Sequence, residues 1–390
     1  MKIEQTKTHL IDYIEVNPRE TIVKGCVAKK IGMDKLQPFC RDIPEYELAE
    51  FNGGSKFRNG DTIMARITPC LENGKTAMVN ILDKNEVGFG STEYIVFRAK
   101  EGLTTPNFVY YLVSSSLIRD PAIKSMVGSS GRQRVQTDVV ENLEIDFPPL
   151  SEQAKIASIL KSFDDKIALN NKINNNLEQQ AKAIFENEFL SLQSLPNGWK
   201  QASLIDIADY LNGLAMQKYR PSADEIGIPV LKIKELRQGC CDDNSELCSP
   251  SIKSDYIIHD GDVIFSWSGS LLVDFWCGGI CGLNQHLFKV TSSKYDKWLY
   301  YTWTKHHLDR FIAVAADKAT TMGHIKRDDL AKAEILMPNE ADYNRIGTLL
   351  QPIYDLIISN RIENNNLADL RDTLLPKLMS GELDVSDIEI

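Results

Sequence analysis

The chain repeats itself, and this repeat constrains the fold more than any other feature. With a shift of 190 residues, Ile145 aligns with Ile335 and Pro148 with Pro338; further matches are Tyr110 with Tyr300, Ile156 with Ile346, Leu160 with Leu350, Asp165 with Asp355, Asn170 with Asn360 and Asn174 with Asn364. Residues 60–63 resemble residues 261–264 at a shift of 201, as insertions in diverging loops would produce. A repeat this long predicts two copies of one structural unit.

The end of each repeat has the residue spacing of a long helix. Mostly apolar residues recur at alternating steps of four and three along two seams: Ile156, Leu160, Phe163, Ile167, Asn170, Asn174, Leu177, Ala181 and Ile184 in the first, and Ile346, Leu350, Ile353, Ile357, Asn360, Asn364, Leu367, Arg371 and Leu374 in the second. This spacing predicts two coiled-coil helices. Pro352 predicts a kink or a new start within the second.

Each seam contains two asparagines at matching positions, Asn170 and Asn174 in the first and Asn360 and Asn364 in the second. An unpaired amide in a seam is costly, whereas a paired amide fixes the register of the helices. We therefore interpret these four asparagines as register residues. The alternative is a solvated or frayed Asn-rich segment, which the equal spacing in both seams disfavours.

Before each helical segment, strand-like runs alternate with loops rich in Gly, Asn and Ser. The expected strands are residues 61–67, 94–98, 262–267 and 286–290, and the expected short helices are residues 107–116 and 296–311. The predicted fold class is α+β, with two globular mixed α/β domains separated by two long helices. The predicted segments are 1–147 and 196–337 for the globular domains, and 148–195 and 338–390 for the helical regions.

Composition places the chain among globular proteins. It has 390 residues, no apolar run of 18 and no export-like start, so we expect a cytoplasmic protein without a membrane segment. The eight cysteines are expected to be reduced structural thiols rather than a metal site, although the spacing of Cys277 and Cys281 leaves zinc as an alternative.

The net charge of −10 is unevenly distributed. Lys and Arg against Asp and Glu number 19 and 20 in residues 1–150, 5 and 6 in 151–195, 16 and 18 in 196–337, and 4 and 10 in 338–390. The body of the chain is therefore nearly neutral, and local basic patches can still bind nucleic-acid phosphates.

Two stretches without acidic residues, 121–137 and 318–327, align under the shift of 190 and mix cations with glycine and small hydroxyl residues. Such loops can hold phosphates, and Arg or Gln can read base edges. The candidate DNA contacts in them are Lys124, Arg132, Gln133 and Arg134 in the first, and Thr320, Thr321, His324 and Lys326 in the second. The alternative is an ordinary solvated surface.

Further candidate contacts lie outside these loops. The basic ones are Lys56, Arg58, Arg66, Lys75, Lys218, Arg220, Lys232 and Lys234, and the polar ones at strand starts are Ser91, Thr92, Asn284, Gln285 and His286. Surface charge and turn formation are the alternative interpretations.

No motif for catalysis or for cofactor binding stands out. A P-loop is absent, residues 87–90 do not open a strand–turn–helix unit, and residues 146–149 match an amino-methyltransferase motif poorly. The nuclease-like residues 164–166 fall on the seam helix, where we expect them on the exposed face. We predict no catalytic residue, no bound cofactor and no metal.

Four segments resemble the specificity subunits of type I restriction-modification systems. Residues 60–75 and 87–94 are similar to a target recognition domain of that family, residues 147–153 to the start of its central helical region, and residues 374–383 to its C-terminal end. The resemblance implies two target recognition domains, each reading half of a bipartite site in double-stranded DNA, and an antiparallel helix pair with a pseudo-two-fold repeat.

The resemblance also implies partners that carry the chemistry. Two modification subunits would bring S-adenosylmethionine and methylate adenine, and restriction subunits would bring an ATP-driven motor, with Mg²⁺ on the partners. A helix of about 35 to 40 residues is roughly 55 Å long, enough to hold two domains one DNA turn apart, about 34 to 36 Å.

Three other interpretations remain. The chain is alternatively the specificity component of a Type IIB-like enzyme, which differs in its partners. An autonomous methyltransferase would bind S-adenosylmethionine by itself. A coiled-coil scaffold without a nucleic-acid partner would show no salt-dependent binding to DNA.

Overall fold

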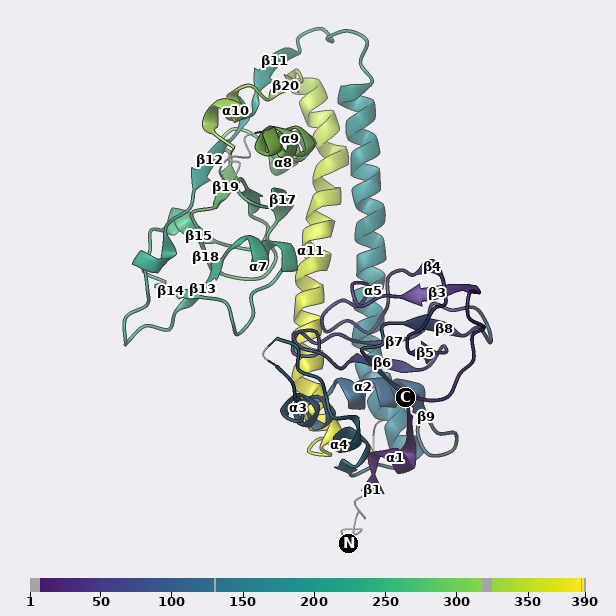
Figure 1. Cartoon of the computed structure of the whole chain (residues 1–390). Coiled ribbons are helices and arrows are strands. Elements are labelled where there is room, and N and C mark those ends of the chain that lie inside the picture. Colours follow the sequence, from purple (N-terminus) through teal and green to yellow (C-terminus); the bar gives the residue numbers. More distant parts are fainter. Residues whose placement is uncertain (1–7, 130, 318–324, 387, 389–390) are drawn as a thin grey trace. The chain divides into compact units, whose positions relative to one another are not determined.

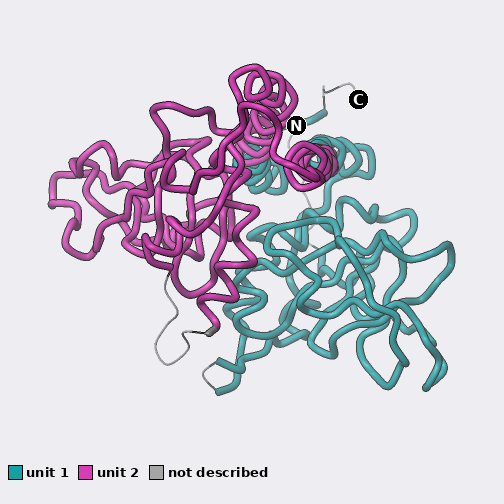
Figure 2. Tube along the Cα trace, turned by 90° about the horizontal axis from the view of Figure 1, so that it is seen from above, with its two compact units in different colours: residues 1–168, 367–390 teal, residues 169–366 magenta. Residues whose placement is uncertain are grey.

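The computed structural model describes residues 8–129, 131–317, 325–386 and 388, and the chain divides into two compact units. Unit 1 contains residues 1–168 and 367–390, and unit 2 contains residues 169–366 (Figure 2). The helices among the described residues include none that is long and apolar enough to cross a membrane.

Unit 1 contains two four-stranded sheets and a two-stranded ladder (Figure 1). The first sheet has the order β2 (Ile14–Val16), β9 (Tyr94–Ala99), β6 (Thr62–Ala65) and β7 (Thr76–Met78). The second has the order β4 (Glu47–Glu50), β3 (Val27–Ile31), β8 (Gly88–Gly90) and β5 (Lys56–Phe57). The ladder joins β1 (Thr8–His9) to β10 (Glu144–Ile145). The short helices are α1 (Leu10–Tyr13), α2 (Pro106–Ser114), α3 (Ser116–Lys124) and α4 (Thr137–Glu141).

Unit 2 repeats this topology, with each strand number raised by ten. Its first sheet is β12 (Asp209–Asn212), β19 (Leu287–Thr291), β16 (Val263–Ser266) and β17 (Leu272–Phe275). Its second is β14 (Leu247–Cys248), β13 (Ile228–Leu231), β18 (Cys281–Leu283) and β15 (Ile257–Ile258). The ladder joins β11 (Lys200–Ser203) to β20 (Glu334–Met337). The α-helices are α6 (Leu204–Ile207), α7 (Ile233–Gln238), α8 (Lys297–His306), α9 (Leu308–Asp317) and α10 (Arg327–Ala331), with 3₁₀ turns at Met216–Lys218 and Ser254–Tyr256.

The matching strand orders confirm the predicted α+β fold and its internal repeat. Among the strands of the described residues, a parallel pair in each unit also matches, since β3 pairs with β8 and β13 with β18. All four predicted strands form within one or two residues of their predicted ends. The single helix predicted over residues 296–311 is wrong: α8 ends at His306, and α9 begins at Leu308.

In the first sheet of each unit, one inner strand, β6 in unit 1 and β16 in unit 2, is buried on both faces. In unit 1, Met64 packs with the helices in one core cluster, while Ile63 packs between the two sheets in another. In unit 2, Phe265 and Ile264 divide in the same way. Successive side chains of a strand point to opposite faces, so a strand of four buried residues joins the two layers of the core.

Two long helices run through both units: α5 (Leu150–Phe185), which continues into a π-helical turn at Glu186–Leu190, and α11 (Glu340–Met379). Within unit 2, Asn170 donates a hydrogen bond to Asn364 at 2.9 Å, and Asn360 donates one to Asn174 at 2.8 Å. Residue numbers that rise along α5 are matched by falling numbers along α11, so the helices pair antiparallel. The predicted new start at Pro352 is wrong, since α11 is continuous and Leu350 and Tyr354 are buried in the core beside it.

Candidate nucleic-acid interface

A turn with the same hydrogen bonds directly precedes β6 in unit 1 and β16 in unit 2. Gly60 and Gly261 have φ angles of 92° and 83°, which favour glycine. The carboxylate of Asp61 accepts the backbone N–H of Arg58 at 2.7 Å, and Asp262 accepts that of His259 at 2.9 Å. The repeated Gly-Asp motif is therefore a structural turn.

The other end of β6 brings together several of the predicted contacts in unit 1. The N–H of Arg66 donates to the carbonyl of Glu93 at 2.9 Å, and the N–H of Val135 donates to the carbonyl of Arg66 at 2.8 Å. Thr68 and Gln133 are joined by two further hydrogen bonds of 3.1 and 3.0 Å. We define edge 1 by the residues that this arrangement gathers: Arg66, Ser91, Thr92, Glu93, Arg132, Gln133 and Arg134.

Edge 1 is polar, and two of its arginines share one carboxylate. Arg134 donates from Nε and Nη2 to Glu93 at 2.6 to 3.0 Å, while Nε of Arg66 lies 3.9 Å from the same carboxylate. The hydrogen bond from Arg134 lowers the pKa of Glu93 below its ordinary value, despite partial burial of the carboxyl. Arg132 is exposed. The edge therefore carries excess positive charge beside an ionised acceptor.

Unit 2 builds the corresponding edge with the same backbone contacts. The N–H of Trp267 donates to the carbonyl of His286 at 3.4 Å, and the N–H of Ile325 donates to the carbonyl of Trp267 at 3.1 Å. Trp267 thus takes the place of Arg66, and His286 takes that of Glu93. We define edge 2 as Trp267, Ser268, Asn284, Gln285 and His286. The predicted contacts Thr320, Thr321 and His324 lie outside the described residues, while Lys326 is exposed just before α10.

The side chains of edge 2 are neutral or titratable rather than permanently charged. Nδ1 of His286 lies 3.0 Å from Oγ of Ser268, and its Nε2 lies 3.2 Å from the amide nitrogen of Gln285. Asn284 is 7% exposed, and its carboxamide oxygen accepts the N–H of His286 at 3.2 Å. Asn284 therefore has the contacts of a turn residue, which was the alternative interpretation of this position.

The remaining candidates in unit 1 occupy other settings. Lys56 lies over the ring of Phe51 at 5.3 Å and directly follows Ser55, whose N–H bonds to the carbonyl of Ser91. Arg58 lies at the opposite end of β6 from edge 1. There it pairs with Glu20 at 2.6 Å. The predicted contact Lys75 donates to the carbonyl of Met33 at 2.7 Å, and Lys124 is exposed at the end of α3.

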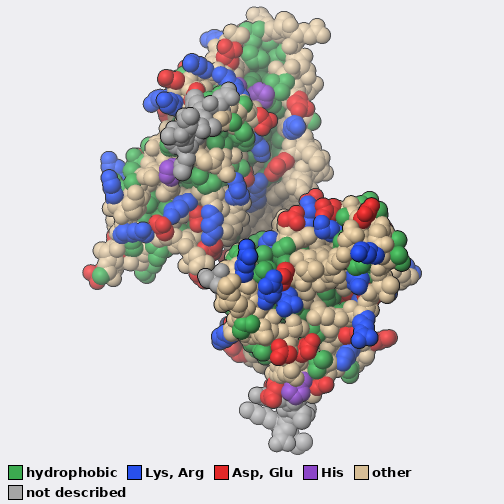
Figure 3. Space-filling view, viewed as in Figure 1, with side chains coloured by type: hydrophobic (Ala, Val, Ile, Leu, Met, Phe, Trp, Pro, Cys, Tyr) green, Lys and Arg blue, Asp and Glu red, His purple; other side chains and the backbone are tan. Residues whose placement is uncertain are grey.

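The remaining basic candidates in unit 2 are largely held in surface ion pairs. Arg220 and Lys232 lie 3.2 and 2.6 Å from Glu246, Lys234 lies 2.8 Å from Asp242, and Lys218 is exposed. On the face shown in Figure 3, acidic side chains lie among the basic ones, so charge alone does not mark a binding surface there. The edges are recognised by their repeated construction instead.

Three edge residues, Glu93, Trp267 and Ser268, were absent from the candidate contacts chosen by sequence. Glu93 stands next to Ser91 and Thr92, and its acidic side chain does not suggest DNA contact. Trp267 has no basic or amide group. A signal for Trp267 was available, because the shift of 201 that relates the Gly-Asp turns places Trp267 on Arg66.

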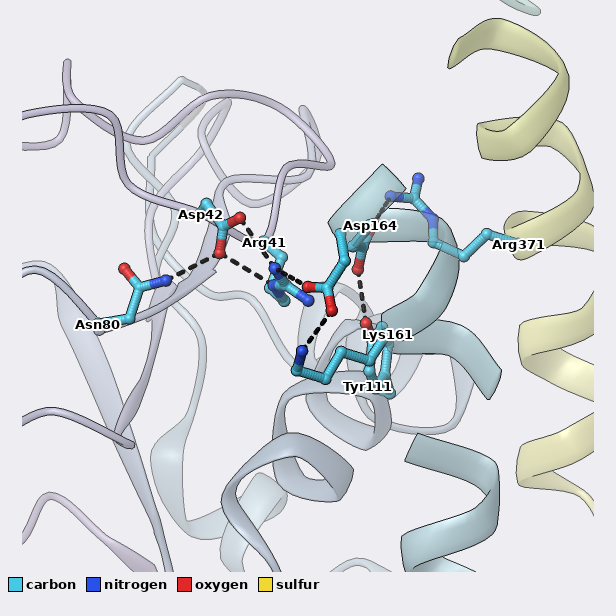
Figure 4. Close-up of polar contacts among 8 residues, drawn as sticks. Arg41, Asp42, Asn80, Tyr111, Lys161, Asp164 and Arg371 are labelled. Carbon is cyan, nitrogen blue, oxygen red and sulfur yellow. Dashed lines mark hydrogen bonds and ion pairs between the residues drawn. The ribbon is translucent and has the colours of Figure 1, made fainter. Parts of the chain in front are cut away.

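Asp164 on α5 corrects another expectation. Asp164 was expected on the exposed face of the helix, but it is 6% exposed. It accepts hydrogen bonds from Tyr111 and Arg371, both at 2.6 Å (Figure 4). Its neighbours Asp165 and Lys166 are exposed, as predicted, and Asp165 accepts from Arg41 at 2.9 Å. Asp164 and Asp165 therefore anchor the globular part of unit 1 to its helices.

Unit 2 is anchored to its helical segments by a different set of residues. Arg361 of α11 donates to Asp274 of β17 at 2.7 Å and to Glu178 of α5 at 2.9 Å. Asn365 donates to the carbonyl of Cys277 at 2.6 Å. In each unit an ion pair ties the globular part to one long helix, Arg41 with Asp165 of α5 in unit 1 and Asp274 with Arg361 of α11 in unit 2. A second ion pair joins the two helices in each unit.

The buried cysteines have the properties of structural thiols. Burial raises the pKa of Cys277 to about 12 and raises that of Cys281 as well. The described residues contain no group of three or more His, Cys, Asp or Glu placed to hold a metal ion.

Fold and edges together define a class of recognition protein with two related binding domains carried on a pair of antiparallel helices. The chain belongs to the type I restriction-modification DNA specificity family, whose domain model matches residues 26–179 and 196–368. This confirms the resemblance seen in the sequence.

Known proteins that are similar to the chain are named as specificity subunits of type I restriction enzymes. It is 27% identical over 314 residues to the specificity subunit of the type I restriction enzyme MjaIX of Methanocaldococcus jannaschii, covering 74% of this chain and 71% of the relative. It is 21% identical over 404 residues to the HindI specificity subunit of Haemophilus influenzae, covering 84% and 87%. A crystal structure of a type I S subunit from M. genitalium has a TM-score of 0.55 at 14% identity and covers 96% of both chains, which supports the fold.

Proposed function

We propose that this chain is the DNA sequence-recognition subunit of a type I restriction-modification complex, in which each globular domain reads one half of a bipartite site. The observation that carries the proposal is the pair of edges, which share their backbone hydrogen bonds but differ in their side chains. Arg66 and Glu93 in unit 1 correspond to Trp267 and His286 in unit 2. Different side chains at equivalent positions suit an asymmetric site, because base edges are distinguished by their donor and acceptor patterns.

The two long helices would set the spacer between the half-sites and dock two modification subunits. Support comes from the hydrogen bonds and ion pairs that fix each globular part to its helical segments, because a rigid attachment is needed for a fixed spacer. The four segments 1–147, 148–195, 196–337 and 338–390 then correspond to recognition, helical, recognition and helical regions.

Chemistry would belong to the partner subunits. S-adenosylmethionine would bind to the modification subunits, while ATP and Mg²⁺ would serve the restriction subunits, all in the cytoplasm. The curated relatives are named as specificity subunits, which fits recognition rather than catalysis in this chain. A Type IIB-like complex differs in its partners, so co-purification of the complex from its host distinguishes the two.

Binding of the assembled methyltransferase to DNA tests this function. We expect affinity that depends on sequence and falls as salt rises, because phosphate contacts release counterions. The measurement is fluorescence anisotropy with a duplex carrying the methylated motif and with a scrambled duplex, at several salt concentrations. A coiled-coil scaffold predicts equal and negligible binding to both duplexes at every salt concentration.

A further inference from the structure

The contact between Glu93 and Arg134 leaves one edge of the arginine available. A guanidinium group carries five N–H donors in a planar fork. Glu93 occupies Nε and one side of Nη2, with distances of 2.6 to 3.0 Å. No described residue hydrogen-bonds to Nη1 of Arg134. The outer edge, formed by Nη1 and the second hydrogen of Nη2, can therefore donate two parallel hydrogen bonds to a ligand.

The backbone of Arg134 is held as firmly as its side chain. Its N–H donates to the carbonyl of Val127 at 2.9 Å, and its own carbonyl accepts from the N–H of Val127 at 3.0 Å. These contacts pair Arg134 with Val127 in an antiparallel β-bridge, and a second antiparallel β-bridge pairs Arg134 with Ile67, just beyond β6. Fixing a long side chain in advance reduces the entropy lost when it binds a partner.

Guanine is the base that fits this outer edge. Its N7 and O6 are two acceptors on the major-groove side, and an arginine that donates to both is the commonest specific contact to DNA. A fixed guanidinium keeps its donors in the plane that such a pair requires. Phosphate also accepts from arginine, but it carries no sequence information.

We propose that Glu93 is a positioning residue that orients Arg134 to read one guanine in the half-site recognised by unit 1. This inference rests on the proposed function, and it goes further by assigning a base and a pair of residues. It applies to unit 1 alone, because His286 stands in the place of Glu93 in unit 2 and offers no carboxylate.

The test uses the full chain assembled with its modification subunits and duplexes that carry its methylated motif. Each guanine of the unit 1 half-site is replaced in turn by 7-deazaguanine, which lacks the N7 acceptor. We expect the unaltered complex to lose affinity about ten-fold at one of these guanines. Arg134→Ala should bind the natural and 7-deaza duplexes equally. Glu93→Gln should show a smaller ratio of the affinity for the natural duplex to that for the 7-deaza duplex at the same guanine.

The chain provides a matched control in unit 2. Arg345 donates two hydrogen bonds to Glu188, at 2.9 and 2.7 Å, and the side chains are 50% and 16% exposed, against 48% and 22% for Arg134 and Glu93. Glu188→Gln should keep the full ratio at the sensitive guanine. If it lowers the ratio as Glu93→Gln does, the effect comes from losing an ion pair anywhere in the chain, and the positioning role is wrong.

Other outcomes also decide the proposal. An Arg134→Ala complex with the unaltered profile at every guanine would remove Arg134 from base reading. If the Arg134→Ala complex binds natural and 7-deaza duplexes equally but the Glu93→Gln complex keeps the full affinity ratio, the positioning role of Glu93 would be wrong. A natural complex without any sequence preference would instead contradict the proposed function itself.

Discussion

At the scale of single residues, unit 1 uses arginine in two ways. The side chain of Arg371 is 10% exposed and pairs with the buried carboxylate of Asp164, whereas the side chain of Arg134 is 48% exposed on Glu93. Removing one partner of a buried pair leaves an uncompensated charge and costs about 3 to 5 kcal/mol. An exposed pair contributes about 1 kcal/mol or less. The first contact therefore maintains the fold, whereas the second adds little to stability and serves to orient Arg134.

The first prediction concerns the buried pair. Asp164→Ala should lower the free energy of unfolding of unit 1 by about 3 kcal/mol or more, because both Tyr111 and Arg371 lose an acceptor. Asp165→Ala is the control and should cost about 1 kcal/mol or less, since Arg41 keeps its two hydrogen bonds to Asp42.

The two units can be followed separately in this experiment. All five tryptophans, at positions 199, 267, 276, 298 and 303, lie in unit 2. Tryptophan fluorescence therefore reports the unfolding of unit 2, and hydrogen exchange of peptides from unit 1 reports the other unit. If Asp164→Ala and Asp165→Ala lower the free energy of unfolding of unit 1 equally, the structural role of Asp164 is contradicted.

The second prediction concerns pH. Arg134 lowers the pKa of Glu93, whose ordinary value is 4.5. The pairing thus stabilises the fold above that value and is lost as pH falls through the lowered pKa. Between pH 6 and 8 Glu93 stays ionised, so discrimination at the unit 1 guanine should not change. The measurement is the affinity ratio for natural and 7-deaza duplexes across this range; a ratio that falls towards pH 6 would be incompatible with a fixed pair.

At the scale of elements, the long helices show what sequence can and cannot predict. The asparagines were identified because a polar amide at a seam position needs a partner, and amides on the other helix supply it. The burial of Asp164 was missed because its partners Tyr111 and Arg371 are remote in sequence. Spacing within one helix gives the face that a residue occupies, but not which distant side chain reaches it.

Edge 1 and edge 2 were predictable to a similar extent. Acid-free loops and polar strand starts identified Arg134 and His286, because these positions are local in sequence. Glu93 required the pairing of strand ends, which brings together residues far apart in the chain, whereas the shift of 201 already places Trp267 on Arg66. Single positions such as Arg58 were chosen by charge, and the structure places Arg58 at the turn instead.

The third prediction is that the helices determine the spacer. Deleting residues 177–183 would remove Ala181, which is 3% exposed in the unit 2 core. Inserting one heptad after Ala168 and another after Asn366 instead leaves every contact within each unit intact. Seven residues add about 10 Å to a helix, so the recognised spacer should lengthen by about three base pairs.

Sequencing of the methylated motif measures this spacer. Both half-sites should keep their bases, because the edges are unchanged. An inserted, folded variant that methylates sites with the original spacer would show that the helices do not determine the distance.

At the scale of the whole molecule, the repeat makes recognition modular. Each unit carries its own sheets, core clusters and edge. The fourth prediction is that replacing residues 196–337 by the corresponding domain of a relative changes one half of the methylated motif. The replacement should retain Trp199, whose indole donates to Asp342 of α11 at 2.9 Å. Changes in both halves, from an assembled complex, would contradict separate reading.

The central claim is that this chain selects the DNA sequence on which its complex acts. Its most direct test is genome-wide mapping of methylated adenines in a host that expresses the modification subunits with and without this gene. The account predicts a new motif of two defined half-sites separated by a fixed number of unspecified bases, present only with the gene. An identical pattern of methylation in both strains, with the assembled complex present, would contradict it.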